Sequence, residues 1–184
     1  MSFSLSECIG LRSAIVVVND GARRHAVKKE TAMTKLTAGN PVIGNYHHGQ
    51  ALEILAASRP AQIKAVAEQI LDDIGDVAVI NNRTGLAMLP YQDTVQGTAF
   101  HLGEVLVAEA HIQVPGRGVE GYGAVVGHDL EHAMAMAVID AAMAAGHPAK
   151  PILEFLQTEQ RRQAECDRER LRKVEATRVQ METF

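Results

Sequence analysis

The chain has 184 residues, of which 47% are hydrophobic, and its formal net charge at pH 7 is −4. This length suits one domain of ordinary size with appendages, and the hydrophobic content is sufficient for a core. Only 4% of the residues are aromatic and none is Trp, so platforms for stacking nucleic-acid bases are scarce, and the negative charge also argues against a nucleic-acid partner.

Residues 1–44 differ in pattern from the rest of the chain. The stretch 13–19 (SAIVVVN) predicts a short strand, residues 21–33 are basic without periodicity, and 37–41 (TAGNP) are rich in turn residues. We interpret residues 1–44 as a flexible N-terminal extension that precedes a domain at 45–184. An alternative hypothesis is that translation begins at Met33, and the mass of the natively expressed protein would decide between the two.

Two helices are predicted after this extension. The first covers about 45–57, and Ser58 is expected to cap a second helix that starts at Arg59-Pro60 and ends at Gly75. Because isolated helices of this length are marginally stable, the pair should pack on the sheet that follows. The apolar positions of the second helix recur with helical spacing: Ile63, Val66, Ala67, Ile70, Leu71 and Ile74.

Strand patterns come next. Short strands are predicted at 77–80 and 86–89 around a turn at 81–85, and Pro90 indicates that the second strand ends there or lies at a sheet edge. The strongest signal is 104–114, where one face is apolar and the other becomes polar at Glu109, which predicts a core side and a side facing solvent or a partner. The apolar face consists of Leu106, Ala108, Ala110, Ile112 and Val114.

A turn at 115–118 leads into a strand at 119–126 that contains Gly121 and Gly123, with Gly127 just beyond it. Interior glycines weaken a strand, so this spacing predicts that another backbone, a side chain or a ligand approaches closely. The three glycines are therefore candidates for binding a cofactor.

A helix at 130–145 follows, with Asp129 as its cap and Gly146 at its end. The last segment, 149–184, begins apolar and becomes densely charged between 161 and 178. It is either a solvated helix with ion pairs such as Glu169–Lys173 or an arm that docks on another subunit. The predicted buried residues of the helix at 130–145 are Ala133, Met134, Ala137, Val138, Ala141 and Ala144. The few apolar residues in the charged part of the segment at 149–184 are Leu171, Val174 and Val179.

The start of the helix at 130–145 offers the clearest candidates for chemistry. His128, Glu131 and His132 match the H-x-x-E-H pattern of inverted zinc peptidases, and a metal-dependent hydrolase would use His128 and His132 as ligands. The competing interpretation is that Asp129 caps the helix and the others are polar neighbours. A third ligand on a peptidase scaffold is not evident, so we expect no metal site.

Other candidates for acid or base catalysis are Glu104 and His101, near the start of the longest strand. Ordinary surface positions are the favoured explanation for both residues. With Asp129 and His132, Glu104 completes the set of candidate catalytic residues. The sequence contains no recognisable nucleophile motif or catalytic triad.

From about residue 45 onward, the sequence resembles the PhnG subunit family of the carbon–phosphorus lyase system, which degrades phosphonates. The chain departs from the family at His128 and Leu130, where basic residues are usual. It also departs around Leu89 and Pro90, because the family commonly has a basic residue shortly after TGL. The matching stretches, in the family's order, are LEILAASRPAQI (52–63), TGL (84–86), GTAFHLGEVLV (97–107), GYGAVVGHDLEHA (121–133), VIDAAM (138–143) and EATRVQMETF (175–184).

The resemblance implies a subunit of the carbon–phosphorus lyase core complex, and hence an enzyme only as part of a multi-subunit transferase. The implied step converts ATP and a phosphonate into α-D-ribose 1-methylphosphonate 5-triphosphate or an analogue. The implied partners are PhnI-, PhnH- and PhnJ-like subunits. ATP and the phosphonate are then substrates of the complex, and we expect no cofactor in this subunit, because the iron–sulfur cluster belongs to the PhnJ-like partner.

The expected fold is α+β, with an N-terminal helical pair, a small mostly antiparallel sheet, a helix packed on it and a charged C-terminal helical arm. A cytoplasmic location is expected. Cys8 and Cys166 are far apart and do not form the framework of a small secreted protein. No apolar run reaches the roughly 18 to 20 residues needed to cross a bilayer, and the first residues lack a signal-peptide pattern.

Overall fold

The computed structural model describes residues 43–146 and 149–178. The predicted α+β class is confirmed, including the helical pair, the antiparallel sheet, the packed helix and the C-terminal helix. The predictions for residues 1–42, including Met33, lie outside the described residues. The elements of the described part are α1 (His48–Ala56), α2 (Pro60–Ile74), β1 (Ala78–Gln92), β2 (Ala99–Val114), β3 (Val119–Val126), α3 (Leu130–Ala144) and α4 (Ala149–Ala176).

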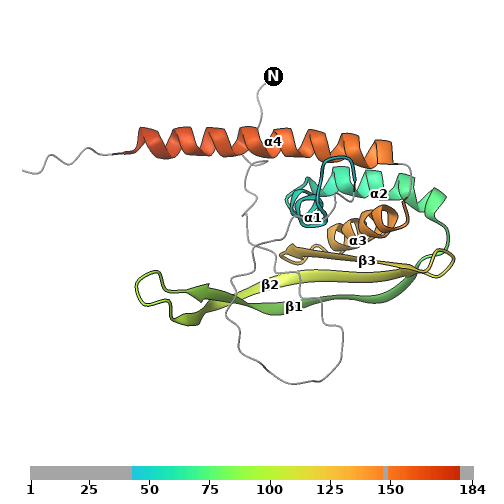
Figure 1. The fold of residues 1–184 in the computed structure, drawn as a ribbon, viewed down its shortest axis with the longest axis horizontal. Helices are drawn as coiled ribbons and strands as arrows, with labels where there is room; N and C mark the ends of the chain where they lie inside the picture. Colours follow the sequence, from blue (N-terminus) through green and yellow to red (C-terminus); the bar gives the residue numbers. More distant parts are fainter. Residues whose placement is uncertain (1–42, 147–148, 179–184) are drawn as a thin grey trace, which may run out of the picture.

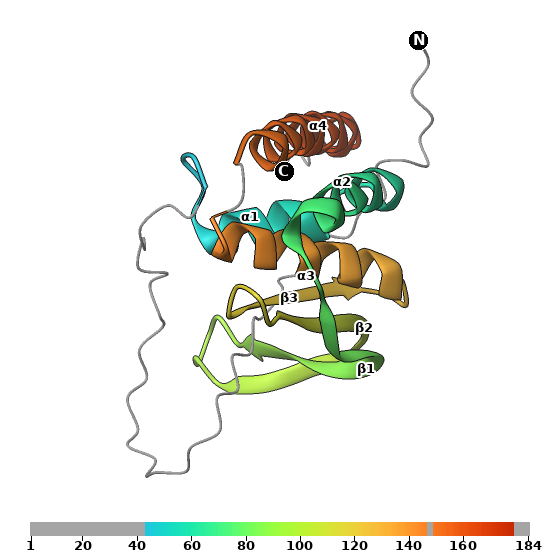
Figure 2. The same cartoon turned by 90° about the vertical axis from the view of Figure 1, so that its right-hand side faces the viewer.

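The elements are stacked in layers (Figure 1). The sheet, in the order β1-β2-β3, has α3 on one face; α1 and α2 cover α3, and α4 lies across them as the outermost layer (Figure 2). The prediction that α2 packs on the sheet is wrong, because α3 returns over the sheet and α2 packs on α3. This central position explains why apolar residues occur all around α3.

Strand β1 runs without interruption for 15 residues, so the prediction of two short strands around a turn at 81–85 is wrong. Within this stretch Arg83 pairs with Glu109 and Gly85 with Val107 of β2. The polar residues are tolerated because β1 is an edge strand with exposed faces, where side-chain packing places few demands on residue type. Pro90 lies in this edge strand next to an irregularity in register, as its edge interpretation requires.

Strand β2 starts at Ala99, earlier than predicted, and its apolar face is confirmed from Ala108 to Val114. Leu106 belongs to the same face but is exposed. In β3, whose bounds match the prediction, Gly121 and Gly123 lie against α3. A Cβ atom at these positions would be 2.1 Å from the carbonyl oxygens of Ala137 and Ala133, respectively. The predicted close neighbour is therefore the backbone of α3.

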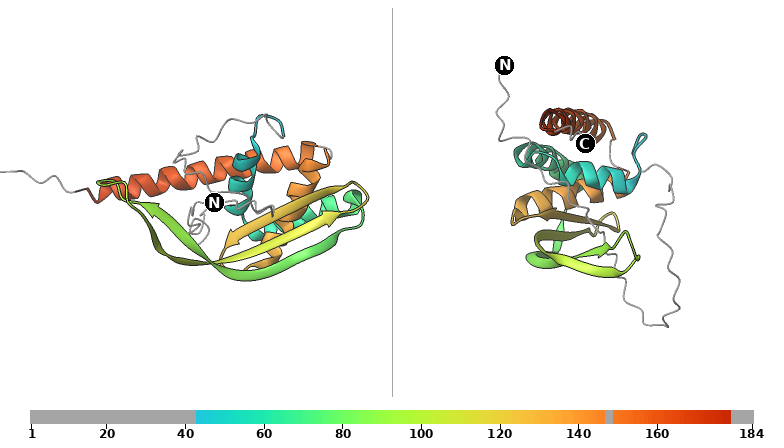
Figure 3. Two further views of the ribbon diagram at one scale, coloured as in Figure 1. Left: turned by 60° about the horizontal axis from the view of Figure 1, so that its bottom comes forward. Right: turned by 90° about the vertical axis from the view of Figure 1, so that its left-hand side faces the viewer.

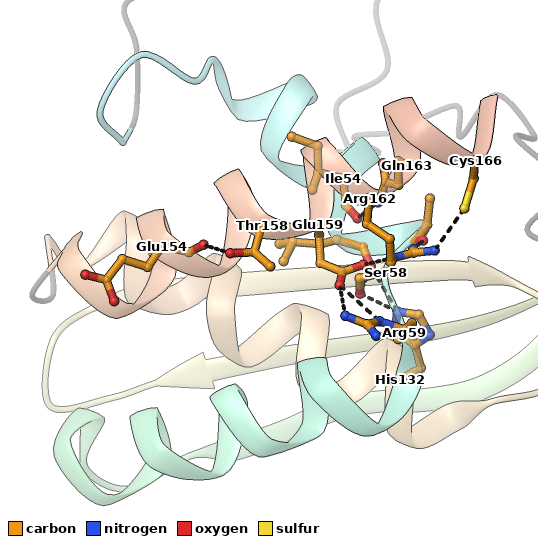
Figure 4. Close-up of polar contacts among 12 residues, drawn as sticks. Ile54, Ser58, Arg59, His132, Glu154, Thr158, Glu159, Arg162, Gln163 and Cys166 are labelled. Atoms are coloured by element: carbon orange, nitrogen blue, oxygen red, sulfur yellow. Dashed lines mark hydrogen bonds and ion pairs between the residues drawn. The ribbon is translucent and has the colours of Figure 1, made fainter. Parts of the chain in front are cut away.

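Helix α4 is attached to the helical pair by a polar cluster in its first half (Figure 4). The Glu159 side chain is completely buried and accepts hydrogen bonds from Arg59 Nη2 at 3.1 Å and Arg162 Nε at 2.8 Å. The Gln163 amide donates to the Ile54 carbonyl at 2.9 Å. Beyond Gln163 the helix leaves the domain, and its ion pair between Lys173 and Glu169 is confirmed.

A few local predictions need correction. Ser58 is not the cap of α2: Arg59 occupies that position, and the buried Ser58 hydroxyl donates to the Leu55 carbonyl at 2.6 Å. Ala144 is exposed because it lies at the end of α3, and Met134 is only half-buried. Leu71 is exposed at the margin of the α2 stripe. Val179 lies outside the described residues.

Candidate functional site

Asp129 caps the start of α3. The Asp129 carboxylate accepts a hydrogen bond from the His132 N–H at 2.9 Å, and Lys64 Nζ lies 3.6 Å away. Partial burial raises the pKa of Asp129, but the His132 N–H and the charge of Lys64 outweigh it and hold this pKa below its usual value. The capping prediction is confirmed.

Replacement of Asp129 by alanine should destabilise the protein by about 0.5 to 2 kcal/mol, because a free N–H group of α3 loses its acceptor. Asp129→Ser keeps an acceptor and should retain most of the stability. The lowered pKa means that this contribution is present above the unfolded-state pKa of about 3.9 and is lost as the pH falls through the lower folded-state value. Urea unfolding at pH 7 measures the difference, and an unchanged midpoint in the alanine variant would contradict the cap.

The side chains of the H-x-x-E-H pattern do not converge. His128 precedes the helix, so His128 and His132 do not lie on one helical face. Glu131 is exposed and pairs with Lys64 at 2.6 Å. His132 is buried with its Nε2 3.0 Å from the Leu55 carbonyl, which only accepts hydrogen bonds, so Nε2 holds the proton and is not free to bind a metal. Among the described residues, no three His, Cys, Asp or Glu side chains are grouped for a metal ion.

A buried carboxylate that the sequence analysis did not single out lies further along α3. Asp140 Oδ1 is 2.6 Å from His48 Nε2, and Oδ2 accepts the backbone N–H of Tyr122 at 2.9 Å. It therefore joins α1, α3 and the outer edge of β3. The only signal in the sequence is an isolated aspartate within an otherwise apolar helical run.

His48 and His132 should titrate on opposite sides of the usual histidine pKa of about 6.5. The hydrogen bond that His48 donates to the Asp140 carboxylate raises the pKa of His48 despite partial burial, whereas burial lowers the pKa of His132. Stability from the His48–Asp140 pair is full below pH 6.5 and is lost as the pH rises through the raised value. Burial of neutral His132 has the opposite effect on stability. As the pH falls, this histidine is protonated in the unfolded chain before it is protonated in the folded protein, so stability decreases. NMR titration of the imidazole signals will test the order, and coincident midpoints would contradict it.

On the sheet face opposite α3, a polar network surrounds Glu109. This carboxylate accepts hydrogen bonds from Arg83, from Asn81 Nδ2 at 3.1 Å and from the Tyr122 hydroxyl at 2.9 Å. The Arg83 guanidinium lowers the pKa of Glu109, while burial and the neighbouring Glu109 raise the pKa of Tyr122 to about 12. The network lies at a concavity of ≈ 740 Å³ that is also lined by His101.

The remaining candidates are distributed over different parts of the fold. Glu104 is exposed on β2 opposite Met88, where only two strands remain paired. Gly127 has a φ of 115° and open space where a Cβ would be, whereas protein atoms fill that space at Gly121 and Gly123. The structure thus groups Asp129 with His132 but places Glu104 in a separate element.

Two exposed surfaces extend beyond the layered body. The first, which we call the ribbon, comprises residues 86–106, where β1 and β2 continue past the last pair between β2 and β3, Val107 and Val126. The second, the arm, comprises residues 164–178, in which Leu171 and Val174 are exposed. Figure 3 shows both from two further directions. The exposed large hydrophobic residues of the ribbon, with exposed fractions from 41% to 86%, are Leu86, Met88, Tyr91, Val95, Phe100, Leu102 and Leu106.

Comparison with known proteins identifies the family. Residues 48–184, well over half of the chain, match the family model described as phosphonate metabolism protein PhnG. No curated protein matches the chain. None of the helices in the described part of the chain combines the length and apolarity that a membrane span requires. Because the family match extends from α1 through α4, the chain belongs to the PhnG family of phosphonate metabolism proteins.

Proposed function

We propose that this protein is a subunit of the carbon–phosphorus lyase core complex and supports the first chemical step on the phosphonate. In that step a phosphonate oxygen bonds to the ribose C1 of ATP, the bond from C1 to adenine breaks, and adenine leaves. The product is α-D-ribose 1-methylphosphonate 5-triphosphate when the substrate is methylphosphonate. The partners are PhnI-, PhnH- and PhnJ-like subunits, and the location is the cytoplasm, where ATP is available.

The observation that supports assembly most directly is the ribbon. A two-stranded ribbon is only marginally stable in water, and three strands or a packed helix are normally needed to hold it. Here seven large hydrophobic side chains are exposed over 21 residues. Exposed apolar surface of this kind is typical of protein–protein contact sites. The ribbon is therefore expected to be covered by another subunit in the working enzyme.

The polar groups of the domain support a structural role for this subunit. His132 donates to the Leu55 carbonyl, Asp129 caps α3, and Glu159 holds α4 through two arginines. Each of these groups is already engaged within the protein, which leaves the acid–base work of glycosyl transfer to residues that the partners supply. We infer that this subunit orients the catalytic partner rather than performing the reaction alone.

Omission of this chain should abolish adenine release from ATP and methylphosphonate by the reconstituted complex. The partners would lose the surface that the ribbon and arm provide, so the reaction should fall to its background rate. Chromatographic measurement of adenine with and without the chain tests this expectation. The chain alone should also release no adenine.

A matched control uses a subunit set completed with the Glu68→Gln variant, which changes an exposed residue of α2 outside both projecting surfaces. This set should react at the parent rate. Full activity without the chain, or full turnover by the isolated chain, would contradict the proposed function.

A further inference from the structure

The ribbon and the arm project past the same end of the body (Figures 1 and 3). Within the body, two layers separate the sheet from α4: first α3, then α1 with α2. Each helix layer adds about 8 to 10 Å. The arm and the ribbon are therefore held apart by the depth of two helix layers.

The surfaces that are covered inside the body continue uncovered outside it. Leu86 and Leu106 pair across the ribbon and belong to the sheet face that binds α3, but they lie beyond the start of that helix. On α4, the stripe that packs on the helical pair includes Leu156 and Gln163, and helical periodicity places Val174 on its continuation. The two uncovered surfaces therefore face the space between the ribbon and the arm. Within the body, the corresponding space is filled by the helical layers.

The charges of the two surfaces differ. Residues 86–106 contain only two formally charged side chains, Asp93 and Glu104. The arm, residues 164–178, contains five basic and four acidic side chains. Arg168 and Arg172 both bond to Glu165. A partner that complements both surfaces is apolar toward the ribbon and charged toward the arm, with a small excess of acidic groups.

We propose that one folded part of a neighbouring subunit, two helix layers thick, lies between the ribbon and the arm and contacts both. Its apolar side covers Leu86 and Leu106, and its charged, slightly acidic side meets the arm. The polar starts of α2 and α3, where Lys64 pairs with Glu131, form the base of the contact. This inference rests on the proposed function, because the neighbour is another subunit of the same complex. A single peptide helix is too thin to reach both surfaces.

Photo-crosslinking in the co-purified complex tests this arrangement. A benzoylphenylalanine is placed at Leu86 on the ribbon or at Val174 on the arm. The control position is Leu71, which is exposed on α2 outside both surfaces. Leu86 and Val174 should link to the same domain of the same partner subunit, and Leu71 should not link to that domain.

Reversal of two arm charges provides a second measurement. Arg172→Glu with Lys173→Glu should slow association with the partner about tenfold at low salt and less at high salt, because the attraction is screened. Glu68→Lys with Asp72→Lys on α2 is the control and should not slow it. If the complex assembles but the two positions link to different subunits, to a second copy of this chain or to nothing, the inference is overturned while the proposed function stands. Failure to co-purify overturns both.

Discussion

Replacement of Glu159 by alanine is expected to loosen α4 and destabilise the protein by about 3 kcal/mol. Removing one member of a buried ion pair leaves its partner charges without compensation, at a cost of about 3 to 5 kcal/mol. The lower end applies because the Arg59 and Arg162 side chains keep 29% and 20% exposure and can recover some hydration. Urea unfolding measures the loss, and hydrogen exchange along α4 shows whether the helix detaches first.

The matched control for this variant is Glu169→Ala, which removes an exposed carboxylate from the same helix. It should leave the unfolding midpoint unchanged, since its pair with Lys173 is solvated. Glu159→Gln should give an intermediate result, because the amide oxygen still accepts a hydrogen bond from one arginine. A Glu159→Ala protein as stable as the parent would show that the cluster does not anchor α4.

Gly123→Ala should destabilise the protein by about 3 kcal/mol, at the upper end of the usual range for overpacked cores. The new Cβ would lie 2.1 Å from the Ala133 carbonyl oxygen and 2.8 Å from the Ala137 nitrogen. Both neighbours are backbone atoms of α3, so the whole helix must shift away from the sheet. Thermal or urea unfolding will give the loss directly.

Gly85→Ala is the corresponding control in β1, where no atom lies within 4 Å of the new Cβ. It should be neutral or gain about 0.5 kcal/mol, because alanine loses less conformational entropy than glycine in a strand. Equal stability of the Gly85 and Gly123 variants would contradict the account of close helix–sheet packing.

Local patterns predicted the elements well where one face of an element meets the core. The alternation in 108–114, the bounds of β3 and the Asp129 cap all depend on neighbours within a few residues. The prediction for the middle of β1 was wrong because Asn81 to Gly85 lack an alternation of apolar residues. Only their pairing with β2 makes them a strand. The H-x-x-E-H pattern misled for a related reason: its spacing presumes a helix, and the helix begins after His128.

The polar contacts that define the interior could not be predicted from the sequence. Arg59 and Glu159 are 100 residues apart, and His48 and Asp140 are 92 apart, so only the folded chain brings them together. A partial signal did exist in α4. Glu159 and Gln163 share the helical spacing of Ile152 and Leu156, which placed all four on the side that turns inward.

The uncovered ribbon also has a consequence for the life of the protein in the cell. A molecule of this protein whose ribbon is uncovered exposes β1, a long edge strand with apolar side chains, to other copies of the chain. Such unassembled molecules tend to aggregate or to be degraded by proteases. If a partner covers the ribbon as proposed, we expect the cell to match the synthesis of this protein closely to that of the partner.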